Sequence, residues 1–127
     1  MPWTAWRAGL EVRLEPLAGL HHAQLEILDN AADGPWPGPA FLDWAAACAR
    51  SLLPWMSPGS LRMEARLEPG AWVLHWPGEL PLPQALHPEA PQHHPSLPGL
   101  WLHHMTPQLG IAITHGPGGL EARLPRP

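Results

Sequence analysis

The feature that most constrains the fold of this chain is one apolar helix pattern with prolines at both ends. Buried-type side chains recur at the i, i+3, i+4, i+7 and i+11 positions of a helical stripe: Phe41, Trp44, Ala45, Cys48 and Leu52. Pro39 suits the first turn of such a helix, and Pro54 ends it. Alanines fill much of the remainder, so the helix is slim. The pattern predicts one long helix that packs closely against a sheet.

Alternating apolar and polar residues predict strands on both sides of this helix. The alternating segments are 10–15 and 20–28 before the helix, expected to pair as a hairpin, and 61–68, 72–76, 100–105, 109–114 and 119–124 after it. Residues 77–99 contain seven prolines and two glycines, which predicts an irregular connection. This order predicts one α+β domain over residues 1–127, with one helix against a mainly antiparallel sheet.

Composition argues against several classes of function. The net charge is −4, there is no lysine, and the seven arginines form no basic stripe, so no nucleic-acid partner is expected. No apolar stretch approaches the ~20 residues that a membrane-spanning helix needs. The N-terminus shows no secretory signal pattern. A single cysteine, Cys48, cannot form an internal disulfide, so the sequence predicts a cytoplasmic protein without a membrane span.

A specific motif opens the predicted helix. Pro37-Gly38 is followed four residues later by Leu42-Asp43, and a strand pair surrounds Pro69-Gly70 downstream. The order of elements resembles the hot-dog fold, and the helix motif is similar to that of the 3-hydroxyacyl-acyl-carrier-protein dehydratases, most of all the dehydratase-like proteins of aryl-polyene biosynthesis. The resemblance covers residues 20–76. It implies one long central helix wrapped by an antiparallel sheet of five to seven strands.

The resemblance also implies a mechanism on acyl thioesters in fatty-acid or polyene-like biosynthesis. In that family the helix carboxylate, here Asp43, assists loss of the 3-hydroxyl as water, while the backbone N–H of Gly38 polarises the thioester carbonyl. The residues implied to bind the acyl chain are Pro37, Phe41, Leu42 and Trp44. The implied partners are acyl carrier protein or acyl-coenzyme A, with a second subunit in a dimer. No cofactor is predicted.

The family's catalytic histidine is missing from this sequence. Asp29 occupies its position, eight residues before Pro37, and Asn30 and Ala32 replace the phenylalanine and glycine that accompany it. Two interpretations remain open. In one, His21, on the same strand face as the apolar residues 25 and 27, serves as the base. In the other, the chain is a catalytically degenerate subunit, in a homodimer or paired with an active dehydratase homologue.

Two further hypotheses belong to other classes. The proline-rich segment 77–99 and the low charge are typical of a non-catalytic protein-interaction module. The adjacent histidine pairs 21–22, 93–94 and 103–104 suggest a metal-binding protein. However, neighbouring residues on a strand point to opposite faces, and no pair has the i, i+4 spacing of a helical zinc site. We therefore expect solvated or core histidines and predict no metal site.

Overall fold

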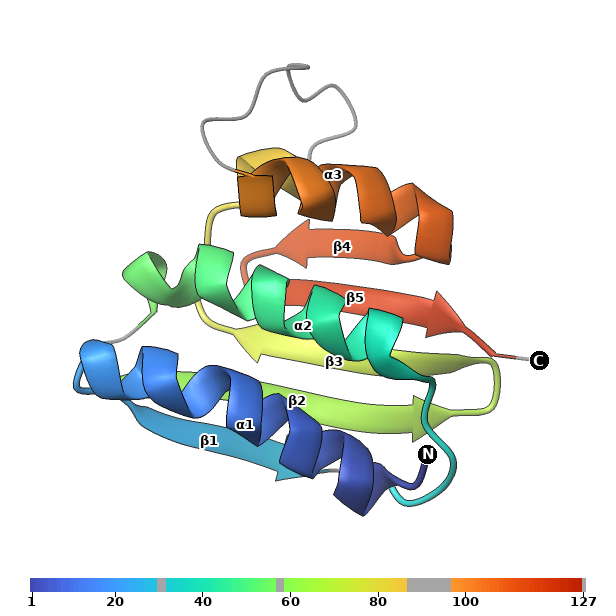
Figure 1. Ribbon diagram of the computed structural model, residues 1–127. Coiled ribbons are helices and arrows are strands. Elements are labelled where there is room, and N and C mark those ends of the chain that lie inside the picture. The colour runs from blue at the N-terminus through green and yellow to red at the C-terminus, as the bar shows by residue number, and fades with distance from the viewer. Residues whose placement is uncertain (30–31, 57–58, 87–96, 127) are drawn as a thin grey trace.

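The computed structural model describes residues 1–29, 32–56, 59–86 and 97–126. Its centre is a five-stranded sheet in the order β1-β2-β3-β5-β4 (Figure 1). The strands are β1 (Gln24–Asp29), β2 (Ser60–Glu68), β3 (Ala71–Pro77), β4 (Ala112–Gly116) and β5 (Gly119–Pro125). The helices are α1 (Trp3–Leu20), α2 (Pro39–Leu52) and α3 (Leu97–Leu109), with two short 3-10 helices, η1 (Leu53–Trp55) and η2 (Gln84–Leu86).

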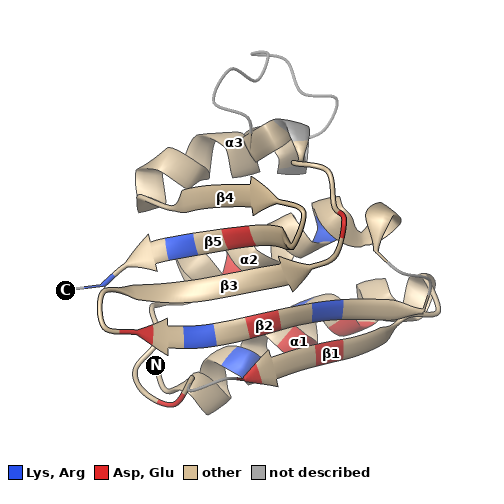
Figure 2. Cartoon of the chain, turned by 180° about the vertical axis from the view of Figure 1, so that it is seen from behind, with Lys and Arg blue, Asp and Glu red and all other residues tan. Residues whose placement is uncertain are grey.

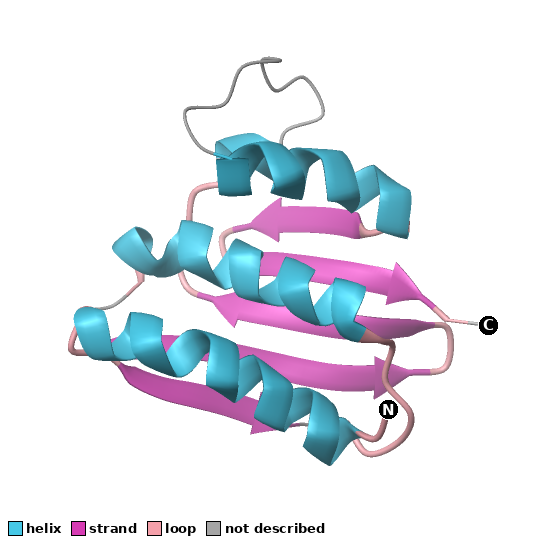
Figure 3. Ribbon diagram, in the orientation of Figure 1, coloured by secondary structure: helices cyan, strands magenta, loops and turns pink. Residues whose placement is uncertain are grey.

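The three α-helices lie on one face of the sheet, so the described part of the molecule has two layers (Figure 1, Figure 3). β1 and β2 are parallel neighbours joined through α2, whereas the other neighbouring pairs are antiparallel. With α2 in front of the sheet, the path from β1 through α2 to β2 is a left-handed crossover (Figure 1). Only about 2% of such connections are left-handed, so this one distinguishes the fold from ordinary βαβ domains.

No described element covers the other face of the sheet, along which positively and negatively charged residues alternate on β2 (Figure 2). Arg66 on β2 contacts the carboxylates of Glu68 and Glu121 at 3.3 and 3.5 Å, and Arg123 on β5 contacts the same two carboxylates at 2.6 and 3.5 Å. Val73 on β3 lies between the two arginines in register and is fully buried. The aliphatic stems of the arginines therefore cover the valine while their charged ends stay at the surface.

The helices pack on the sheet through a continuous run of six aromatic rings. The rings are Trp3, Trp6, Trp36, Phe41, Trp44 and Trp76, each at most 3% exposed, with neighbouring centroids 4.8 to 6.4 Å apart. The run connects α1, the loop before α2, α2 itself and β3. No polar or charged residue is buried among those described. Aromatic packing thus fills the space between α1, α2 and the sheet.

Residues 3–20 form a helix although part of this segment alternates like a strand. The buried residues recur every three or four positions, as in a helix: Trp3, Trp6, Leu10, Leu14 and Ala18. Val12, which the alternation placed beside Leu10 and Leu14, is 71% exposed. The strand predicted at 10–15 and its hairpin with 20–28 are therefore wrong, and only β1 remains of the second strand. The two tryptophans before the alternating window decide the outcome because they anchor the helix in the core.

α1 ends with a left-handed residue. The N–H of Ala23 donates to the carbonyl of Ala18 at 2.8 Å and that of His22 to the carbonyl of Gly19 at 3.2 Å, which is a Schellman-type end. His22 has a φ of 51°, a conformation that glycine adopts without steric cost.

Replacing His22 by glycine is expected to raise the free energy of unfolding by about 1 kcal/mol, because it removes the left-handed strain. Urea unfolding followed by circular dichroism measures the change. His21→Gly is the matched control: His21 has a φ of −98°, so glycine there brings no gain. A midpoint for His22→Gly at or below that of the unsubstituted protein would contradict the prediction.

Residues 97–109 form α3 where a strand at 100–105 was predicted. The helix ends at Gly110, which has a φ of 75°. The Gly110 N–H donates to the carbonyl of Pro107 and the Ile111 N–H to that of Thr106, both at 3.1 Å. The prediction failed because a proline in the last helical turn, followed by glycine, looks like a turn between two strands. Of the strand predicted at 109–114, only its second half remains, as the start of β4.

The hot-dog prediction is wrong, because the sheet does not wrap one central helix. Three helices share one face of the sheet, and β1 and β2 are parallel. The connection predicted at 77–99 contains the loop 78–83, η2 and, from Leu97, the start of α3, while residues 87–96 lie outside the described part. In the described ranges, no helix combines the length and the apolar character needed to cross a bilayer.

Candidate ligand pocket at α3

A cavity of about 460 Å³ lies between η2, α3 and β4, and we call it the α3 pocket. Its lining residues come from three short segments: Leu82, Ala85 and Leu86; His103, Thr106 and Pro107; and Ile111, Ile113 and His115. Its volume falls in the range of small-molecule sites in proteins, about 300–1,000 Å³.

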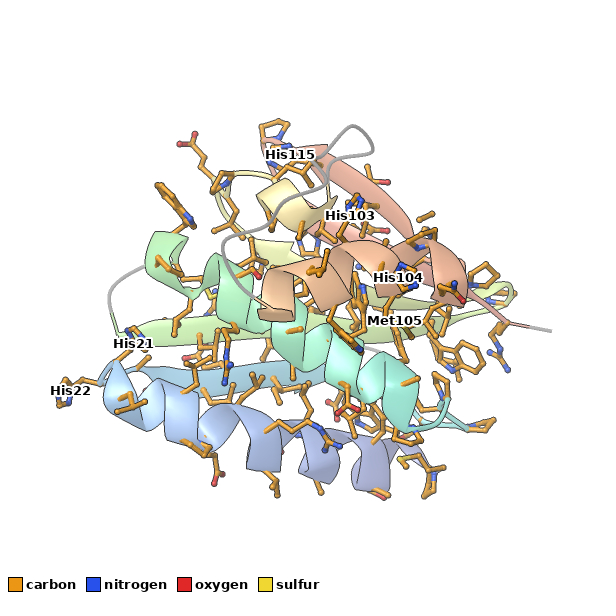
Figure 4. The ribbon with its side chains drawn as sticks, turned by 45° about the horizontal axis from the view of Figure 1, so that its top comes forward. His21, His22, His103, His104, Met105 and His115 are labelled. Carbon is orange, nitrogen blue, oxygen red and sulfur yellow. The ribbon has the colours of Figure 1, made fainter. Side chains whose placement is uncertain are left out.

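The helical spacing of α3 and the alternation of β4 place the lining side chains on the faces that border the α3 pocket. Residues 103, 106 and 107 stand at i, i+3 and i+4 on α3, so they share one helix face. Ile113 and His115 are alternate residues of β4, and they pair with Ala122 and Leu120 of β5 on the helix-covered face of the sheet. Figure 4 shows His103 on α3 and His115 on the strand behind it. The pocket is therefore formed by regular elements that hold its walls in place.

The polar groups of the α3 pocket are held by hydrogen bonds. The Thr106 hydroxyl donates to the Leu102 carbonyl at 2.7 Å and accepts from Trp44 Nε1 at 2.9 Å, which leaves its second lone pair as an acceptor. His115 Nε2 bonds to the Leu80 carbonyl, so in the neutral ring Nδ1 is an acceptor. His103 Nδ1 bonds to the Ala85 carbonyl at 3.0 Å, which holds this ring against η2.

The described walls of the α3 pocket carry no full charge, because no Asp, Glu, Lys or Arg lines it. Nor do the described residues contain a group of three His, Cys, Asp or Glu side chains that could hold a metal ion. Aliphatic walls with a few fixed acceptors suit a flat ligand that is held by packing and that donates hydrogen bonds.

The one cysteine lies in an environment that disfavours the reactive thiolate. Cys48 lies on the buried stripe of α2 and has no exposed surface. Burial raises the pKa of its thiol far above the ordinary value, because the thiolate would lose its hydration. The side chain acts as a small apolar residue in the core.

Of the three residues with dehydratase-type roles, Asp43 and Gly38 lie in the first turns of α2, whereas His21 lies at the end of α1. Asp43 lies on the outer surface of α2, 51% exposed, with an oxygen 2.8 Å from Arg13 Nε. Gly38 is the N-cap of α2, and a Cβ added there would meet nothing within 4 Å. His21 is exposed at the far end of α1, roughly 27 Å along an 18-residue helix from its start (Figure 4).

The remaining residues of that prediction hold the structure together. Asp29 accepts from Trp3 Nε1 at 3.0 Å and lies 3.4 Å from Arg7, so it connects β1 to α1. Pro37 is half-buried in the loop before α2. The other three residues implied to bind an acyl chain are buried in the core: Phe41, Leu42 and Trp44.

Sequence reasoning missed the α3 pocket because it assigned residues 100–105 to a strand. The signal was present in the helical spacing of His103, Thr106 and Pro107, with Gly110 as a stop. The contribution of η2 comes from the segment 77–99, whose prolines and glycines predict an irregular connection and no short helix.

The sequence matches no protein-family model, and no curated protein sequence is significantly similar to it. Solved structures of similar fold include the catalytic domain of the histidine kinase ThkA, with a TM-score of 0.69 and 10% identity over 98% of this chain and 94% of that chain. The histidine kinase AdeS of Acinetobacter baumannii gives 0.65 and 12%, over 98% of this chain and 65% of its own. A mycobacterial sensor histidine kinase, MprB, gives 0.54 and 16%, over 98% and 96%.

These likenesses show the fold, which is that of a histidine kinase catalytic domain. The dehydratase assignment is wrong, and so are the predictions that depended on it. These are the acyl thioester substrate, the acyl carrier protein or acyl-coenzyme A partner, and the dimer with a dehydratase homologue. The motif Pro37-Gly38 with Leu42-Asp43 opens a helix in both folds, which explains why local sequence favoured the wrong one.

Proposed function

We propose that this domain binds a flat heteroaromatic ligand that donates hydrogen bonds, with adenosine as the model ligand, in the α3 pocket. One observation carries the proposal: a cavity of about 460 Å³ combines aliphatic walls with fixed hydrogen-bond acceptors. The leucines near η2 and the isoleucines near β4 offer two apolar surfaces between which a ring can pack. The acceptors on Thr106 and His115 complement an exocyclic amino group.

The fold supports the choice of a nucleoside. ThkA is described in a nucleotide-free form, and kinases transfer phosphoryl groups from nucleotides. Because no arginine or lysine is among the residues lining the α3 pocket, the binding free energy should come from base and ribose rather than from phosphates. The proposal therefore differs from ordinary nucleotide binding in one measurable respect. Adenosine, AMP and ATP should bind about equally well, with or without Mg²⁺.

Isothermal titration calorimetry with adenosine tests the proposal. At about 0.3 kcal/mol per non-hydrogen atom, the Kd should be on the order of 0.1 mM. Purine riboside, which lacks the exocyclic amino group, should bind about tenfold more weakly, because the acceptors lose their donor. Failure of adenosine to give a saturable signal at millimolar concentration would contradict the proposal.

A matched pair of variants tests whether adenosine binds in the α3 pocket. Ile113→Trp should fill the cavity and weaken adenosine binding at least tenfold. Thr114→Trp puts the same side chain on the opposite face of β4 and should leave the affinity unchanged. Thermal unfolding checks that both variants fold. Equal affinities for the two variants would place the ligand elsewhere.

A further inference from the structure

α1 is apolar on two sides, one of which faces solvent. Its inner stripe packs in the core, as described above. Its outer stripe consists of exposed residues at spacings of three or four: Ala5, Ala8, Val12, Pro16 and Leu20. Val12 is 71% and Leu20 79% exposed. A surface helix normally presents polar side chains on its outer face, so this stripe is unusual for a side that stays in water.

A groove between α1 and α2 continues the outer stripe. It encloses about 280 Å³, with Leu17, Ala46 and Ala47 as partly exposed apolar lining residues. The helices approach closely here, since a Cβ on Gly9 would meet Leu42 Cδ2 at 2.7 Å. On α1 the residues at positions 9, 13 and 17 lie between the outer stripe and the groove. Stripe and groove therefore form one largely apolar surface, interrupted by the Arg13–Asp43 ion pair, which we call the α1–α2 surface.

The charges along the α1–α2 surface are unevenly matched. Arg13 is paired with Asp43 at 2.8 Å across the groove. Arg50, in the last turn of α2, also lines the groove, and it has no ion pair or hydrogen bond within the described part of the chain. The groove thus carries one uncompensated positive charge next to its apolar floor.

Pro16 interrupts the backbone hydrogen bonding of α1 within the outer stripe. It has no N–H, so the carbonyl of Val12 lacks the i+4 donor of a regular helix. Val12 itself is 71% exposed. A hydrogen-bond donor on an occupant of the stripe would replace the missing one.

We propose that the α1–α2 surface docks an amphipathic helix of a partner protein that carries carboxylates along the flank facing Arg50. A helix fits because two nearly parallel helices leave a groove along their length, into which a third helix can set its ridge (Figure 1). Small residues such as Ala8 and Ala47 permit a close approach. The unpaired Arg50 selects acidic over basic flanks, since a carboxylate there gains a charge-assisted hydrogen bond.

The experiment uses two synthetic helical peptides with the same leucine–alanine face. One carries glutamates on its flanks, and the other carries lysines at the same positions. Fluorescence anisotropy with the full chain should show at least tenfold tighter binding of the glutamate peptide. Arg50→Glu should reverse the preference, and Val12→Glu should weaken both peptides at least tenfold. Glu15→Gln, on the β1 side of α1, is the control and should change nothing.

Several outcomes would overturn the proposal. These are equal binding of the two peptides, binding of neither, or a preference that Arg50→Glu leaves intact. A concentration-dependent dimer that Val12→Glu abolishes would assign the surface to a second copy of this chain instead. Ile113→Trp fills the α3 pocket and leaves α1 unchanged. This variant should therefore bind the glutamate peptide as tightly as the unsubstituted protein does, even where it no longer binds adenosine.

Discussion

Replacing Trp44 by alanine is expected to lower the free energy of unfolding by about 3–5 kcal/mol, the range for truncating a buried aromatic side chain. The indole has no exposed surface, contacts the rings of Phe41 and Trp76 at centroid distances of 6.1 and 6.4 Å, and donates to Thr106 at 2.9 Å. Its removal interrupts the aromatic run and breaks the hydrogen bond between α2 and α3. Because a domain has only about 5–15 kcal/mol of stability in total, the loss is severe.

Two controls separate the contributions of Trp44. Trp44→Phe keeps most of the ring packing but removes the indole N–H, so it should cost about 1–2 kcal/mol. Trp55→Ala applies the same truncation to a side chain that is 63% exposed, and it should change stability by less than about 0.5 kcal/mol. Urea unfolding of all three variants measures the differences. A loss for Trp44→Ala no larger than that for Trp55→Ala would contradict the described core.

Gly119→Ala is expected to cost about 3 kcal/mol or more. Gly119 begins β5 with a φ of 127°, a region that is almost closed to side-chain-bearing residues. A Cβ there would also lie against the carbonyl oxygen of Trp76, far inside van der Waals contact, and 3.0 Å from Pro77 Cα. Since these atoms belong to the backbone of β3, the clash can be relieved only by separating β3 from β5.

Gly118→Ala is the matched control, because a Cβ on Gly118 would meet nothing within 4 Å. This variant should unfold within about 0.5 kcal/mol of the unsubstituted protein. Thermal unfolding of the pair should give clearly separated melting temperatures, by roughly 10 °C or more for a domain of this size. Equal melting temperatures would mean that β3 and β5 do not approach as described.

Local patterns predicted the elements whose core-facing residues lie close together in sequence. Residues 39–52 show a helical stripe bounded by prolines, and α2 occupies those residues. The segments around Pro69-Gly70 alternate cleanly, and β2 and β3 pair there as an antiparallel hairpin. In both cases the burial that stabilises the element follows the pattern of its own side chains.

Patterns failed where distant contacts decide which face is buried. The alternation in residues 10–15 is genuine, yet Trp3 and Trp6 commit the segment to a helix by packing on Trp36. The parallel pairing of β1 with β2 depends on a crossover of 30 residues, which no local spacing reveals. The order of strands, and therefore the fold, was out of reach of local reasoning.

At the candidate site residues, too, local patterns did not predict the contacts between elements. Asp43 lies in the first turns of a helix, as predicted, but its ion-pair partner Arg13 belongs to another helix, which no local pattern reveals. The α3 pocket needs three segments to meet, and two of them were assigned to the wrong kind of structure. A site formed between elements becomes visible only when the elements themselves are assigned correctly.

The sheet face opposite the helices influences whether molecules of this protein aggregate in solution. Bare sheets tend to stack on one another, and stacked sheets begin aggregates. Here a second apolar layer would have to strip water from Arg66, Arg123 and their glutamate partners, a cost that exceeds the gain from covering the small apolar area between them. The ion pairs of Arg66 and Arg123 therefore disfavour stacking of another sheet on this face. Any association is expected on the helical side of the molecule instead.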